Sequence, residues 1–216
     1  MSARICVIAP GLATAVQDAG RRGYEHLGCM VGGWLDDESA RAANQLVGNL
    51  PTDALLEIAL IGPTLEFPDG GWAALTGADL GCTIDGEPWP PGGSRRLPAG
   101  ARVAFGSALR GLRAYLAVAG GIDVASILES RATDLVAGFG GFHGRLLRAG
   151  DDLTFAAAAA PFATLVSAPL RTGPVVRVLP GPACDDFRAG ALDDFLTTPF
   201  RVGLDSDRVG LRLDGA

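Results

Sequence analysis

Short apolar runs separated by glycine, proline and acidic residues recur along the chain, and this pattern predicts many short β-strands joined by tight turns. The predicted strands are residues 3–8, 55–61, 64–67, 73–77, 82–84, 101–106, 113–120, 152–156 and 175–181. Asp85-Gly86 has the composition of a two-residue hairpin turn, and Pro98-Ala99-Gly100 predicts a reversal before the next strand.

Two segments have helical periodicity instead. Residues 35–49 have acidic side chains near their start, which suit a helix N-terminus, and Gly48 is expected to end the helix. Residues 185–199 end before Pro199. The apolar faces of the two predicted helices are Ala40, Ala43, Leu46 and Val47, and Phe187, Ala191, Phe195 and Leu196. Strands outnumber helices, so we expect a mainly β (β-rich α+β) fold with barrel-like architecture and few short helices.

The composition shifts to Ala, Pro, Ser and Thr between Ala156 and Pro174. This shift predicts a connector over residues 156–174, between a first β-rich module (1–155) and a second module (175–216). Because the second module holds one predicted helix and little strand, we expect it to be the incomplete start of a second barrel.

Composition and charge exclude several functions. The 216 residues carry a net charge of −6, which argues against a nucleic-acid partner or an anionic membrane. All 18 basic residues are arginine, so neither a Walker phosphate loop nor Schiff-base chemistry is available. Four scattered cysteines and two histidines predict a reduced, cytoplasmic protein without a metal site.

A first polar cluster lies in "TAVQDAGRRGYEHLG", residues 14–28. Gln17, Asp18 and Arg21 make it a candidate anion-binding loop, since a guanidinium group suits a carboxylate or a phosphate. Asp18 is expected to orient Arg21; in the alternative, the two residues pair only to lock a long loop.

Two further carboxylates are candidates for acid–base chemistry. Asp36 either caps the following helix or faces a ligand. Glu57 lies within the apolar run "LLEIALI", where its carboxylate needs a partner or a raised pKa. An arginine-paired Glu57 and a catalytic Glu57 are both consistent with this position.

A second polar cluster is "ESRATDLVAGFGGFHGR", residues 129–145. Ser130, Arg131 and Thr133 are candidate donors to an anion, and Gly140-Gly141 supplies flexible backbone donors. Arg145 either binds phosphate or pairs with Asp151, and the pairing is favoured.

A third cluster, "SDRVGLRL", places Ser206, Asp207 and Arg208 near the end of the chain. Arg208 and Arg212 would share one face of a strand, which permits a double-arginine anion site. A solvated charged strand edge is the alternative.

These clusters occur in order with "LEIALIGPTLEF", "LTGADL", "YLAVAGGI" and "LPGP", and the whole chain then resembles the allophanate hydrolase subunit 2, or biotin-dependent carboxyltransferase, family. The resemblance implies cyclophilin-like β-barrels, with Asp18, Asp36 and Glu57 as orienting or acid–base candidates. It also implies that Arg21, Arg131 and Arg208 bind a substrate carboxylate or phosphate. Family members continue beyond the point where this chain stops, and they have Ser where Gly32 stands.

Three activities are compatible with this family. The first is ATP-dependent opening of 5-oxo-L-proline to L-glutamate, as the C subunit of a 5-oxoprolinase. Its partners would be a protein like the B subunit of that enzyme and a third hydrolase subunit, with ATP bound either by this chain or by a partner. The second is carboxyl transfer from carboxybiotin, carried on another protein, to urea or a related amide. The third is a non-catalytic antagonist of a sensor-kinase inhibitor.

Overall fold

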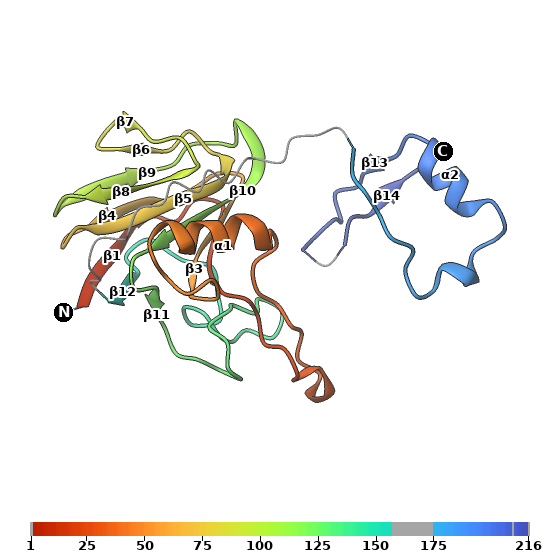
Figure 1. Cartoon of the computed structure of the whole chain (residues 1–216), viewed down its shortest axis with the longest axis horizontal. Helices are drawn as coiled ribbons and strands as arrows, with labels where there is room; N and C mark the ends of the chain where they lie inside the picture. Colours follow the sequence, from red (N-terminus) through yellow and green to blue (C-terminus); the bar gives the residue numbers. More distant parts are fainter. Residues whose placement is uncertain (1, 157–174, 209, 216) are drawn as a thin grey trace. The chain divides into compact units, whose positions relative to one another are not determined.

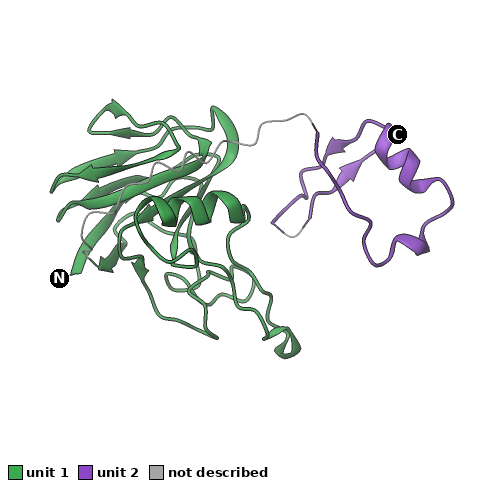
Figure 2. Ribbon diagram, in the orientation of Figure 1, with its two compact units in different colours: residues 1–170 green, residues 171–216 purple. Residues whose placement is uncertain are grey.

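The computed structural model describes residues 2–156, 175–208 and 210–215. The chain divides into two compact units, residues 1–170 and 171–216 (Figure 2), and each is described by itself. Apart from Ala156, the predicted connector lies outside the described residues.

The described residues of unit 1 form two antiparallel sheets (Figure 1). The strands are β1 (Ser2–Ala9), β2 (Ala13–Gln17), β3 (Leu55–Ala59), β4 (Thr64–Phe67), β5 (Gly71–Asp79), β6 (Thr83–Ile84), β7 (Glu87–Pro88), β8 (Gly93–Leu97), β9 (Ala101–Ala104), β10 (Arg110–Val118), β11 (Ile122–Asp123) and β12 (Asp152–Ala156). One sheet has the order β11-β12-β1-β4-β9-β6-β7 and the other has the order β2-β3-β10-β5-β8. The predicted mainly β fold with few short helices is confirmed, although these two sheets are open and do not close into a barrel.

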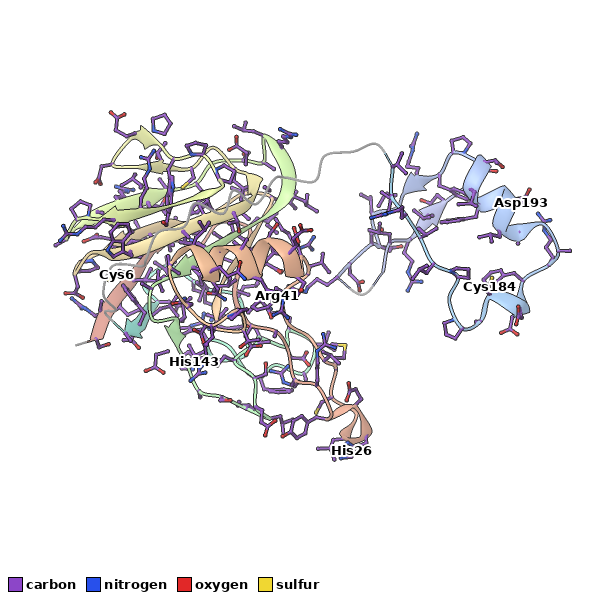
Figure 3. The ribbon with its side chains drawn as sticks, viewed as in Figure 1. Cys6, His26, Arg41, His143, Cys184 and Asp193 are labelled. Atoms are coloured by element: carbon purple, nitrogen blue, oxygen red, sulfur yellow. The ribbon has the colours of Figure 1, made fainter. Side chains whose placement is uncertain are left out.

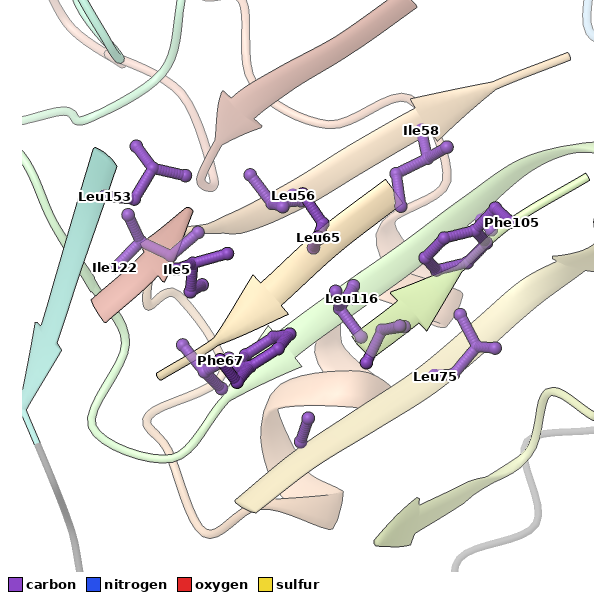
Figure 4. Packing of buried hydrophobic residues seen from close by; sticks show 14 of the residues in the cluster. Ile5, Leu56, Ile58, Leu65, Phe67, Leu75, Phe105, Leu116, Ile122 and Leu153 are labelled. Carbon is purple, nitrogen blue, oxygen red and sulfur yellow. The ribbon is translucent and has the colours of Figure 1, made fainter. Parts of the chain in front are cut away.

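The main core lies between the two sheets. Alternate residues of each strand point inward, so Ile5 and Leu65 of one sheet meet Leu56 and Leu116 of the other (Figure 4). Phe67 and Phe155 pack edge to face, with ring centroids 6.3 Å apart. Burial of these apolar side chains is the main stabilising contribution to unit 1.

Helix α1 (Asp37–Leu46) packs on the outer face of the five-stranded sheet. Its buried side chains include the predicted face, which is Ala40, Ala43, Leu46 and Val47. They contact Tyr115 and Ala117, which alternate with the inward-facing Leu116 on β10. Both faces of β10 are therefore buried from Ala114 to Val118, which explains the continuous apolar sequence of this part of the strand.

Most of the predicted strands of unit 1 are present, and the Asp85-Gly86 hairpin is confirmed. Both turn residues have positive φ angles, 51° and 89°, and Ile84 pairs with Glu87. Strands β2 and β8 are the longest of the strands that were not predicted. β2 overlaps the first polar cluster, and β8 holds Arg95 and Arg96, so neither strand has the apolar pattern on which the predictions rest.

Unit 2 contains α2 (Ala191–Thr197), β13 (Arg201–Val202) and β14 (Leu213–Asp214) in its described residues, with a 3₁₀ turn at Cys184–Asp186. The predicted strand 175–181 is wrong, because these residues are not in strand conformation and pair with no described strand. The predicted helix 185–199 is shortened to α2, which begins after Gly190 in a left-handed conformation. Phe187 therefore lies outside the helix, and it is exposed.

No helix among the described residues is both long and apolar enough to cross a membrane.

Candidate functional site

The first two polar clusters of the sequence lie side by side in unit 1. Thr133 donates from its backbone N and from Oγ1 to the carbonyl of Val16, at 3.0 and 2.8 Å. Gln17 Nε2 donates in return to the carbonyl of Thr133 at 3.2 Å. The segment after Ser130 thus covers the outer edge of β2, which brings together candidates more than 110 residues apart.

Asp18 joins the two clusters through its carboxylate. It is 8% exposed and accepts hydrogen bonds from Gly20 N (2.8 Å), Ser130 Oγ (2.6 Å) and Arg131 N (2.5 Å). The expected Asp18–Arg21 pair is absent from the described contacts, because these three donors occupy the carboxylate. Asp18 therefore positions the loops rather than orienting Arg21.

Arg21 lies between the two loops and is only 1% exposed. Its Nη2 donates to the carbonyl of Ala132 at 2.5 Å, and its guanidinium carbon lies 4.6 Å from the centroid of the Phe139 ring. Among the described residues, Nε and Nη1 have no hydrogen-bond partner. Because buried polar groups are nearly always satisfied, these two donors mark a place where a ligand or water can bind.

Gly140 and Gly141 let the loops approach closely. A Cβ atom on Gly140 would lie 2.2 Å from the carbonyl oxygen of Ala132 and 2.8 Å from Arg21 Nη2. A Cβ atom on Gly141 would lie 1.9 Å from Thr133 Oγ1. The space that a side chain would occupy is therefore filled by protein at both positions, and the close approach of the loops requires glycine there.

Arg131 faces a different space from Arg21. Its Nε donates to the carbonyl of Val124 at 2.9 Å, and its side chain lines a pocket of about 350 Å³ together with Asp53, Gly121 and Asp123. Arg21 does not line this pocket. The described residues therefore do not bring the two guanidinium groups into one cavity.

Glu57 forms a second buried polar centre on the α1 side of the five-stranded sheet. It is 4% exposed, and its Oε2 accepts hydrogen bonds from Leu35 N (2.8 Å) and Tyr115 Oη (3.1 Å). Arg113 Nε lies 3.6 Å from Oε1. This arrangement agrees with the arginine-paired alternative for Glu57.

Tyr115 and Asp36 complete this centre. Burial, together with the nearby Glu57 carboxylate, raises the pKa of Tyr115 well above its ordinary value, so its hydroxyl stays protonated. Asp36 donates from its backbone N to Tyr115 Oη at 2.8 Å, and its carboxylate accepts from Ser39 N at 3.0 Å at the start of α1. The side chain of Asp36 thus caps the helix, as the simpler alternative predicted.

Arg145 pairs with Asp151 through two parallel hydrogen bonds of 2.7 and 2.8 Å. This pairing lowers the pKa of Asp151 and raises that of Arg145. The guanidinium of Arg145 therefore binds Asp151. The sequence analysis favoured this pairing over phosphate binding.

The third cluster lies in unit 2. Ser206 Oγ accepts from Arg212 N at 2.9 Å, and Asp207 Oδ1 accepts from Gly210 N at 3.0 Å. Arg208 lies in a bend, so the strand expected to align Arg208 with Arg212 is wrong. The turn contacts of Ser206 and Asp207 replace strand pairing at this point.

The sequence patterns did not reveal Phe139 and Tyr115. Phe139 stacks on the guanidinium of Arg21, which lies far earlier in the chain, and no local pattern signals this contact. Tyr115 lies in the apolar part of β10, and its hydroxyl is the one feature of the sequence that could have pointed to a buried hydrogen bond at this position. His26 lies at the tip of the loop that follows Arg21 (Figure 3) and is exposed.

No cluster of His, Cys, Asp and Glu among the described residues has the geometry of a metal site.

The fold and the matched segment define a carboxyltransferase-domain protein. Residues 27–216 match the family model described as "Carboxyltransferase domain, subdomain A and B", and the chain belongs to this family. It is 39% identical to the C subunit of 5-oxoprolinase from Escherichia coli over 97% of the chain and 68% of that protein. It is 32% identical to urea amidolyase of Lachancea kluyveri over 97% of the chain and 12% of that protein.

Solved structures agree with this assignment. The crystal structure of TTHA0988 matches with a TM-score of 0.86 at 39% identity, covering 99% of this chain and 42% of that chain. The K. lactis urea amidolyase matches with a TM-score of 0.86 at 32% identity, covering 99% of this chain and 14% of that one. This chain therefore spans less than half of each of these two solved chains.

Proposed function

We propose that this chain belongs to an ATP-dependent 5-oxoprolinase of several subunits, which opens the lactam of 5-oxo-L-proline to give L-glutamate. The observation that carries the proposal is the 39% identity to the C subunit of the E. coli 5-oxoprolinase over 97% of the chain. The chain spans 68% of that relative but only 12% of the urea amidolyase of L. kluyveri. Because that relative is named as one subunit of an enzyme, the similarity also supports action within a complex.

The chemistry explains why ATP is needed. A lactam carbonyl is a poor electrophile, and phosphorylation of its oxygen makes attack by water far easier. The activated substrate then carries two anionic groups, its carboxylate and the new phosphate. Guanidinium groups bind carboxylates and phosphates alike, but Arg21 and Arg131 face different spaces, so either one, and not both, is a candidate in unit 1 for one of these groups.

We assign ATP itself to a partner subunit. The described residues offer no lysine-bearing phosphate loop, and Gly140 and Gly141 are buried. The expected partners are a protein like the B subunit of 5-oxoprolinase and a third hydrolase subunit.

The test is reconstitution with these partners, 5-oxoproline and ATP. Glutamate and phosphate are expected in equal amounts, and omission of any one chain is expected to abolish both. Arg131→Gln is expected to lower kcat/KM about tenfold or more, through loss of a charge-assisted contact. Arg96→Gln, at an exposed position on β8, is the matched control and is expected to have no effect. An assembled complex that releases no glutamate would contradict the proposal.

Carboxyl transfer to urea or a related amide is the second candidate, favoured by the family description and by the urea amidolyase relatives. Carboxybiotin would arrive on another protein, because this chain has no lysine to carry biotin. Transfer of the carboxyl group from carboxybiotin to urea by the reconstituted complex, giving carboxylated urea and free biotin without glutamate release from 5-oxoproline, would favour this second activity.

A further inference from the structure

The pocket that Arg131 lines has the size of a small-molecule site, at about 350 Å³. It lies where β11 and the end of β12 meet the chain just before β3 and just after β10. Part of its lining is apolar and comes from Ala54, Ile122 and Phe155, which are otherwise buried in unit 1. The hydrocarbon part of a small ligand can therefore be buried in this pocket.

Arg131 is held in place and still has two nitrogen atoms available for a ligand. Its backbone N donates to the carboxylate of Asp18, and its Nε donates to the carbonyl of Val124 at 2.9 Å. Nη1 and Nη2 form no hydrogen bond or ion pair with any described residue. The N–H groups at this end of the guanidinium are parallel, and they match the two oxygens of a carboxylate.

Asp53 and Asp123 bring two negative charges to the same pocket. Asp53 Oδ2 accepts a hydrogen bond from Leu50 N at 2.8 Å, which orients the side chain, and its Oδ1 has no described partner. The carboxylate of Asp123, on the edge strand β11, is exposed and has no partner in the described part of the chain. Neither carboxylate forms an ion pair with Arg131, so both signs of charge remain available in the pocket.

We propose that this pocket binds a zwitterionic α-amino acid, with its carboxylate on Nη1 and Nη2 of Arg131 and its ammonium group at Asp53 and Asp123. A simple carboxylate would contact Arg131 but leave both aspartates without a cation. A simple amine would contact the aspartates but leave Arg131 without an anion. One arginine and two aspartates give the pocket a net charge of −1, which disfavours a dianion such as phosphate. An α-amino acid complements both signs of charge within one small molecule.

The binding of an amino acid does not rest on the proposed function, but the identification of that amino acid as L-glutamate does. The carboxylate of 5-oxo-L-proline can contact Arg131, whereas its lactam nitrogen is not basic and gives the aspartates no cation. Opening of the lactam creates the ammonium group that Asp53 and Asp123 can bind. With this assignment, the pocket binds the product of the reaction more tightly than the substrate.

The experiment follows the backbone amide resonances of Gly121 and Ile122 in the full chain by NMR. L-Leucine is compared with 4-methylpentanoate, which lacks the amino group, and with 3-methylbutylamine, which lacks the carboxylate. We expect saturable binding of L-leucine, about tenfold or more tighter than that of either analogue, because each analogue lacks one charge-assisted contact. No saturable change with any amino acid, or an analogue that binds as tightly as L-leucine, would overturn the proposal.

L-Glutamate and 5-oxo-L-proline, added in the same way, identify the source of the ligand. Tighter binding of L-glutamate than of L-leucine and 5-oxo-L-proline assigns the pocket to the proposed reaction, and tighter binding of L-leucine assigns it to an amino acid outside that reaction. Glutamate formation by the reconstituted complex without amino-acid binding to this chain would remove the pocket and keep the proposed function. Amino-acid binding without glutamate formation would do the converse.

Charge-removing variants test the two ends of the ligand separately. Asp123→Asn is expected to weaken L-leucine binding about fivefold or more and to leave 4-methylpentanoate binding no weaker. Arg131→Gln is expected to weaken the binding of both and to leave 3-methylbutylamine binding no weaker. Asp69→Asn removes the same charge outside the pocket, and it is expected to leave L-leucine binding within about twofold. Equal weakening of L-leucine and 4-methylpentanoate by Asp123→Asn would contradict the ammonium site.

Discussion

Tyr115 and Glu57 lie directly opposite each other on β10 and β3, and the hydroxyl of Tyr115 donates to Glu57 Oε2 at 3.1 Å. The same hydroxyl accepts the N–H of Asp36 at 2.8 Å, immediately before α1 begins. One buried phenol thus connects a sheet carboxylate to the start of the helix that covers the sheet. The pair therefore fixes where the chain passes from the Arg21 loop into α1.

Tyr115→Phe removes this connection while preserving the ring. Two hydrogen bonds are lost, and Asp36 N–H is left without its partner, so we expect a loss of about 1–3 kcal/mol in the free energy of unfolding. Urea denaturation measures this loss. Tyr24→Phe, in the loop after Arg21, is the control and is expected to be neutral, because the Tyr24 hydroxyl has no described partner. Equal stability of the two variants would show that the Tyr115 hydroxyl does not hold α1.

Asp18→Asn tests whether Asp18 holds the two polar loops together. The amide has one acceptor oxygen in place of two, and its NH₂ group would face the N–H of Arg131 or the hydroxyl of Ser130. We expect a loss of about 2–4 kcal/mol in unfolding free energy. Hydrogen exchange at the amides of Gly20 and Arg131 should accelerate as well.

Asp123→Asn is the control for this change, since the carboxylate of Asp123 is exposed and makes no described hydrogen bond. It is expected to change the unfolding free energy by less than about 0.5 kcal/mol. Unchanged exchange at Arg131 in Asp18→Asn would contradict the linking role of Asp18.

Local patterns were sufficient for much of unit 1. The acidic start and the spacing of Ala40, Ala43 and Leu46 predicted α1, because helix periodicity and capping are properties of neighbouring residues. The Asp85-Gly86 hairpin was predictable for the same reason, since its turn depends on two adjacent residues.

Long-range contacts were not predictable in this way. The polar clusters around Arg21 and Arg131 were identified as candidates, but their contact depends on a segment that covers β2 from more than 110 residues away. β2 was itself hidden, since its last residue, Gln17, belongs to the polar cluster. The partners of Arg21 follow from how the sheets and loops pack, and this information is not contained in any window of the sequence.

Asp151→Asn is expected to lower stability in a manner that depends on pH. The bidentate pair with Arg145 holds the pKa of Asp151 below the ordinary carboxyl value of 3.8. A lowered folded-state pKa means that the stabilisation is fully present above pH 3.8 and is lost as the pH falls through the folded-state pKa. We therefore expect wild type to exceed Asp151→Asn by about 1–3 kcal/mol at pH 7, with the difference shrinking below pH 3.8.

Chemical denaturation between pH 2.5 and 7 measures this difference. Asp69→Asn is the control, because Asp69 pairs with Arg4 at the surface, where both side chains are about half exposed and water screens the charges. A difference for Asp151→Asn that is constant across the range, or that grows at low pH, would show that the Arg145 pair does not account for the stabilisation.

The four cysteines are expected to differ in reactivity. Burial raises the pKa of Cys82 to about 12, and a hydrogen bond to Asp152 is the main cause that raises the pKa of Cys6 to about 11. Because the thiolate is the nucleophile, each raised pKa lowers the reactive fraction at pH 8 by roughly a hundredfold or more.

Brief treatment with iodoacetamide, followed by peptide mass spectrometry, should label Cys29 and Cys184 before Cys6 and Cys82. Asp152→Asn should accelerate the labelling of Cys6 and leave Cys82 unchanged. Rapid labelling of Cys82 in the native protein would contradict its buried position between the sheets.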